Sequence, residues 1–70
     1  MIVEVFKTNV QTEIDTNYII DTIHRQFPEY HINFDLEDCD KILRVEALEL
    51  NPKNIIQYVN NLGYICIPLE

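Results

Sequence analysis

Residues 31–48 read HINFDLEDCDKILRVEAL, and they carry the strongest secondary-structure pattern of the chain. It contains two runs in which apolar and polar residues alternate, which is typical of strands with one buried and one solvated face. The apolar members are Ile32, Phe34 and Leu36 in the first run and Leu43, Val45 and Ala47 in the second. Residues 37–40, between the runs, are polar and have the composition of a turn. The sequence therefore predicts an antiparallel hairpin with strands at 31–37 and 41–48.

A strand and a helix are predicted ahead of this hairpin. Residues 2–9 carry Ile2, Phe6 and Thr8 on one face and Val3, Val5 and Lys7 on the other. Thr12 is a suitable N-cap residue, and the acidic Glu13 and Asp15 suit the positive end of a helix dipole. The helix is predicted to end at Pro28, because proline cannot continue it. Its apolar stripe consists of Ile19, Ile20, Ile23 and Phe27.

A second helix and a last strand are predicted after the hairpin. Asn51 and Pro52 form a strong helix start, because asparagine caps free amides and proline suits the first helical position. The stripe that follows is Ile55, Ile56, Val59 and Leu62. Gly63 is the only glycine and stands where a left-handed helix cap is expected. The strand over residues 64–69 is predicted to carry Ile65, Ile67 and Leu69 inward and Tyr64, Cys66 and Pro68 outward. Pro68 cannot donate to a ladder, which favours an edge strand.

The predicted order of elements is therefore β-α-β-β-α-β within a single domain, residues 1–70. The compact arrangement for this order is an α+β, ferredoxin-like sandwich, with a four-stranded antiparallel sheet and two helices on one face. The residues expected inward include Phe6, Ile20, Ile23, Phe34, Val45, Ile56 and Val59.

The charge of the chain limits the partners it suits. Twelve acidic residues stand against five basic ones, for a net charge of −7. The five basic residues are scattered, so nucleic acid and anionic membranes are poor partners, whereas cations or a basic protein face fit better. The strand pattern begins at Ile2 with no signal peptide ahead of it, and no apolar run approaches the ~20 residues of a membrane span. We therefore expect a cytoplasmic protein with both cysteines reduced.

Four segments, taken together, resemble the heavy-metal-associated domain. They are FKTNV at 6–10, DKILRVE at 40–46, NP at 51–52 and LGY at 62–64. This family includes small copper chaperones and the N-terminal modules of metal-pumping ATPases. The resemblance implies the ferredoxin-like fold and a Cys-x-x-Cys pair, between the first strand and the first helix, that holds a soft ion such as Cu(I).

In this chain the two family positions are occupied by Thr12 and Asp15. A hydroxyl and a carboxylate are not the sulfur ligands that Cu(I) prefers, so the sequence predicts no metal and no cofactor at this place. Weaker metal candidates are Asp38, Cys39 and Asp40 at the hairpin tip. We expect this tip to share one end of the fold with Thr12, Asp15 and Tyr64. Cys66 is a further weak candidate, as a ligand shared across a dimer. His24 and His31 are expected to be surface residues, because no partner at a zinc-ligand spacing accompanies them.

These observations favour a non-catalytic interaction module that binds a protein partner or its own copy. The outward side chains Val3, Val5, Ile42 and Cys66 are expected to form an apolar strip on the uncovered face of the sheet. The main alternative is a metal-handling protein with an altered site. A small-molecule regulatory domain of the ACT kind is a third hypothesis, although the glycine-containing loop typical of it is missing. No catalytic constellation is recognisable, and residues 9–15 hold neither the glycine nor the arginine of an acylphosphatase loop.

Overall fold

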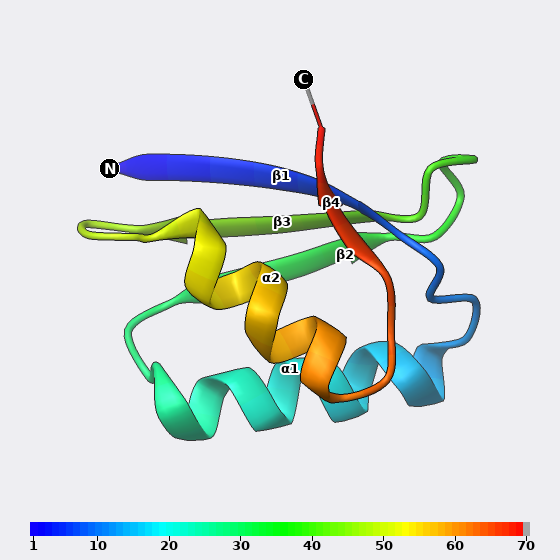
Figure 1. Ribbon diagram of the computed structural model, residues 1–70, viewed down its shortest axis with the longest axis horizontal. Helices are drawn as coiled ribbons and strands as arrows, with labels where there is room; N and C mark the ends of the chain where they lie inside the picture. Colours follow the sequence, from blue (N-terminus) through cyan, green and yellow to red (C-terminus); the bar gives the residue numbers. More distant parts are fainter. Residues whose placement is uncertain (70) are drawn as a thin grey trace.

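The computed structural model describes residues 1–69 and contains the six elements in the predicted order. They are β1 (Ile2–Thr8), α1 (Glu13–Gln26), β2 (His31–Asp35), β3 (Ile42–Ala47), α2 (Pro52–Asn61) and β4 (Cys66–Pro68). The four strands form one antiparallel sheet in the order β2-β3-β1-β4. Figure 1 shows both helices on the same side of this sheet. The predicted α+β arrangement is therefore confirmed, and it is consistent with a ferredoxin-like fold.

The register between the two central strands explains which side chains form the core. Phe6 of β1 lies opposite Leu43 of β3, and residues opposite one another in an antiparallel pair share a face. Both side chains are fully buried beneath the helices. The other face of the sheet carries no helix (Figure 1). We call it the open face.

The buried core contains twelve apolar side chains. They are Phe6, Val10, Ile19, Ile23, Tyr30, Ile32, Leu43, Val45, Ala47, Ile55, Val59 and Cys66. Among the predicted core residues, Ile20, Phe34 and Ile56 are only partly buried and pack against this cluster. In α2 the fully buried positions are Ile55 and Val59, so Ile55 takes the central place expected for Ile56 and the helix is rotated slightly from the predicted orientation.

Both predicted helix starts are confirmed. The Thr12 hydroxyl accepts from the Asp15 amide at 3.2 Å, and the Asn51 side-chain oxygen accepts from the Lys53 amide at 3.1 Å. The predicted cap after α2 is also present, because Gly63 has φ of 101° and its amide donates to the Asn60 carbonyl at 3.0 Å.

The inward and outward sides predicted for the last strand are wrong. Cys66 is buried, with 4% of its surface exposed, whereas Ile65, Ile67 and Leu69 are exposed by 41–54%. The cause is the register: Thr8, a buried residue of β1, lies opposite Cys66. Two hydrogen bonds just before the strand hold the chain in this register, namely the Tyr64 amide to the Val59 carbonyl (3.3 Å) and the Ile65 amide to the Asn9 side chain (2.8 Å). They prevail over the aliphatic alternation of the segment.

None of the helices formed within residues 1–69 is both long enough and apolar enough to cross a bilayer.

Candidate functional site

Thr12 and Asp15, at the positions where the resemblance would place a metal-binding pair, are joined to each other by hydrogen bonds. The Thr12 hydroxyl donates to Oδ2 of Asp15 at 2.9 Å and accepts from the Asp15 amide. The second carboxylate oxygen of Asp15, Oδ1, accepts from the Tyr64 hydroxyl at 2.7 Å. The bond between Tyr64 and Asp15 raises the pKa of Tyr64, because the carboxylate holds the phenolic proton, and burial adds to the effect. Thr12, Asp15 and Tyr64 thus form a structural network that ties the start of α1 to the loop after α2.

The hairpin tip brings three possible ligand atoms together. The Cys39 thiol and the carboxylates of Asp38 and Asp40 lie within 4.8 Å of one another, the one such group within residues 1–69. Figure 1 shows this tip and the loop between β1 and α1 at the same end of the fold, as predicted. Asp15 is not part of the group, however. The Asp38 carboxylate accepts from the Asp40 amide at 2.8 Å, and the Asp40 carboxylate lies 3.6 Å from the Lys7 ammonium. Both carboxylates therefore already have partners within the protein.

Cys66 does not face outward, contrary to the prediction from the sequence. Its thiol faces the helices, and burial raises its pKa to about 12. A buried, protonated thiol is neither a nucleophile nor a ready metal ligand. The residue fills space in the core, as a small apolar side chain does.

The two cysteines should therefore differ sharply in reactivity. Cys39 is exposed and Cys66 is buried. At neutral pH one thiol should react rapidly with an aromatic disulfide reagent, and the second only after denaturation. The Cys39→Ser variant should show no rapid reaction in the native state. A fast reaction of that variant would mean that Cys66 is accessible, contrary to its position opposite Thr8.

The histidines do not converge on a ligand site. The ring Nε2 of His24 lies 2.7 Å from the Tyr30 carbonyl, so this side chain fastens the end of α1 to the segment before β2. His31 is exposed at the start of β2. Neither belongs to a group of possible metal ligands among the described residues.

An apolar strip does lie on the open face, with a changed membership. Val3, Val5 and Ile42 are on this face as predicted, because they alternate with the buried residues of β1 and β3. Ile67 lies opposite Lys7, and Leu69 donates its amide to the Val5 carbonyl at 2.9 Å, which places both on the same face. We define the open-face strip as Val3, Val5, Ile42, Ile67 and Leu69. Sequence reasoning missed the last two because it inverted β4.

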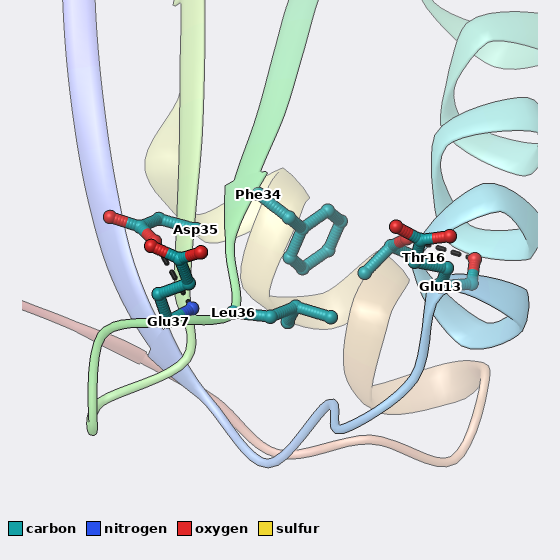
Figure 2. Close-up of a pocket in the computed structure, with 6 residues that line it drawn as sticks. All are labelled: Glu13, Thr16, Phe34, Asp35, Leu36 and Glu37. Carbon is teal, nitrogen blue, oxygen red and sulfur yellow. Dashed lines mark hydrogen bonds between the residues drawn. The ribbon is translucent and has the colours of Figure 1, made fainter.

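A shallow groove of about 340 Å³ lies between the start of α1 and the end of β2. In Figure 2, Phe34 and Leu36 point toward α1, where they meet Thr16 and Glu13. Asp35 points from β2 to the other side of the sheet, as does Glu37 just beyond it (Figure 2). The groove therefore has an apolar floor, with the Glu13 carboxylate beside it on α1 and those of Asp35 and Glu37 on the opposite side of the sheet. The alternation of apolar and acidic residues at 34–37 could have indicated this groove from the sequence. That Glu13 lies beside it could be seen only in the folded structure.

The chain matches no protein-family model, no curated protein and no solved structure.

Proposed function

We propose that this chain is a non-catalytic interaction module that pairs with a second copy of itself through the open face of its sheet. On this proposal the scaffold is that of a heavy-metal-associated domain whose metal pair has been replaced. The network of Thr12, Asp15 and Tyr64 supports the replacement, because the side chains at the family positions are used for structure.

The observation that carries the proposal is the open-face strip. Val3 is 45% exposed, Ile67 51% and Leu69 41%, and they are neighbours along and across β1 and β4. A contiguous apolar area on a solvated sheet is typical of an interaction surface. Burying such an area is favourable at about 25 cal/mol per Å² of apolar surface, before the cost of association.

The distribution of charge favours a second copy as the occupant. The open face carries Lys7 and Arg44 against Asp35, Glu37 and Glu46, and Arg44 and Glu46 form an ion pair on it. This face is therefore close to neutral although the chain has a net charge of −7. Two copies repel one another least when they meet through this face. Because the remaining repulsion is screened by salt, the dimer should strengthen as ionic strength rises.

The test is sedimentation velocity over a range of concentrations. The wild type should sediment faster as concentration rises, and Val5→Lys and Ile67→Lys should remain monomeric, since each places a charge in the apolar contact. Ile14→Lys is the matched control, because Ile14 is 81% exposed on α1 and the change in charge is identical. This control should behave as the wild type does.

Two outcomes would contradict the proposal. The first is a wild type that stays monomeric at all concentrations and at high salt. The second is an equal loss of association in Ile14→Lys, which would mean that association does not involve the open face. Circular dichroism of each variant shows whether it has folded.

A further inference from the structure

The two edges of the sheet differ in how their backbone is protected. At the β4 edge, the Leu69 amide donates to Val5, so alternate residues of β4 direct their backbone groups toward β1. The residues between them, Cys66 and Pro68, direct theirs outward. Pro68 has no N–H to offer there, and β4 is only three residues long. Proline and shortness are both means by which proteins prevent an edge from pairing.

The β2 edge lacks this protection. Val5 and Lys7 bond to β4, so the even-numbered residues of β1 bond to β3. These even-numbered residues of β1 lie opposite odd-numbered residues of β3, which therefore bond to β1. The even-numbered residues of β3 then bond to β2, where they lie opposite odd-numbered residues. This leaves Ile32 and Phe34 with N–H and C=O groups directed away from the sheet. A five-residue edge with two free donors and two free acceptors is thus available for a further strand.

The groove described above lies beside this edge. A strand added to β2 would place alternate side chains on the two faces of the sheet. On the helix side they would meet Phe34 and Leu36, which are both partly buried and form the apolar floor (Figure 2). On the open side they would meet Asp35 and Glu37, which are exposed.

The carboxylates around the edge have no cationic partner of their own. The ion pairs within residues 1–69 are Lys7 with Asp40 and Arg44 with Glu46. Asp35, Glu37 and Glu13 take part in neither. The Lys41 ammonium donates to the Leu36 carbonyl at 2.9 Å and is in neither ion pair.

From these features we propose that the outer edge of β2 binds an extended segment of another protein, in which apolar residues alternate with lysine or arginine. Backbone bonds to Ile32 and Phe34 would supply affinity, as in other cases of strand addition. The apolar residues would cover the groove floor, and the cations would pair with Asp35 and Glu37. A second copy is not the occupant, because its own β2 edge would bring like charges together. This surface lies at the outer edge of β2, whereas the open-face strip lies across β1, β3 and β4, and the two surfaces are adjacent where Ile42 lies opposite Asp35.

The probe is a capped peptide of alternating valine and lysine, titrated by fluorescence anisotropy. A peptide of the same composition, with its lysines and valines in separate blocks, controls for attraction to an acidic protein. The alternating peptide should bind at least about tenfold more tightly than the block peptide, which cannot match both sides of the edge. Backbone amide exchange should slow at Ile32 and Phe34 on binding.

Charge reversal at the edge should abolish this preference. Asp35→Lys with Glu37→Lys should weaken binding about tenfold or more. Asp21→Lys with Glu49→Lys is the matched control, since both acids are exposed and the change in net charge is the same. It should weaken binding less than about threefold, because distant charges are screened.

The proposal is overturned if both double variants lose affinity equally, if the block peptide binds as well as the alternating one, or if exchange slows at Cys66 instead of Ile32 and Phe34. The Val5→Lys variant should bind the peptide as the wild type does. A failure of peptide binding would therefore not contradict self-association, and a monomeric wild type would not contradict peptide binding.

Discussion

Ile55→Ala should lower the free energy of unfolding by about 2–5 kcal/mol, because it deletes a fully buried aliphatic side chain and leaves a cavity. Domains of this length typically have a stability of only roughly 4–10 kcal/mol. The substitution should therefore remove a large share of the total. Thermal unfolding should move down by about 10 °C or more. Denaturant titration followed by circular dichroism measures the change directly.

The neighbouring residue supplies the control. Ile56 is partly buried and packs against the edge of the core, so Ile56→Ala should cost only about 1 kcal/mol. Alanine suits a helix interior equally well at both positions, so helix propensity cancels in the comparison. Equal losses, or a larger loss at Ile56, would show that α2 is rotated relative to the described structure.

The comparison at Ile55 and Ile56 shows where sequence reasoning reaches its limit in the helices. The apolar stripe of α2 identifies the face that packs on the sheet, and the structure confirms that face. Two adjacent isoleucines lie about 100° apart on a helix, so periodicity alone does not decide which of them is central. The docking angle on the sheet decides it, and that depends on the whole core.

β4 illustrates a different limit. Three aliphatic residues in and beside this strand, Ile65, Ile67 and Leu69, alternate cleanly, which predicts that they face inward. The helix cap at Gly63 and the bond from Ile65 to Asn9 set the register in the opposite sense. A strand at the edge of a sheet has one neighbour and little core to cover, so hydrophobic alternation constrains it weakly.

Sequence reasoning placed the loops of the candidate site at one end of the fold, but it predicted individual bonds only where the contacts are local. The capping role of Thr12 is encoded in adjacent residues and was predicted correctly. The bond between Tyr64 and Asp15 joins residues 49 positions apart, and no local pattern specifies it. The groove at β2 likewise depends on Glu13 coming close to the end of a strand that is separated from it by a helix.

Thr12→Cys combined with Asp15→Cys should convert the chain from one that loses Cu(I) to a modest competing chelator into one that retains one equivalent. The side chains at these positions already converge, since the Thr12 hydroxyl is 2.9 Å from the Asp15 carboxylate. Two thiols would be positioned at the N-terminus of α1, where the helix dipole favours the thiolate. Thiolates are the ligands that Cu(I) prefers.

The same double substitution should destabilise the metal-free protein. It removes the N-cap of α1, which typically contributes about 0.5–2 kcal/mol, and the bond from Tyr64. Cu(I) should restore the lost stability, because a ligand that binds only the folded state raises its unfolding temperature. Thermal unfolding with and without Cu(I), at equal protein concentration, measures both effects.

Two further variants separate the engineered site from other sources of binding. Thr12→Ser with Asp15→Ser matches the cysteine pair in size but offers no thiolate, and it should retain no Cu(I). Adding Cys39→Ser to the cysteine pair should leave binding intact, because Cys39 lies on the hairpin tip and not in the network of Asp15. If the cysteine pair folds but does not bind Cu(I), the correspondence of Thr12 and Asp15 to the family's metal positions is wrong. If the wild type itself retains one equivalent that Cys39→Ser abolishes, the metal-handling alternative replaces the interaction module.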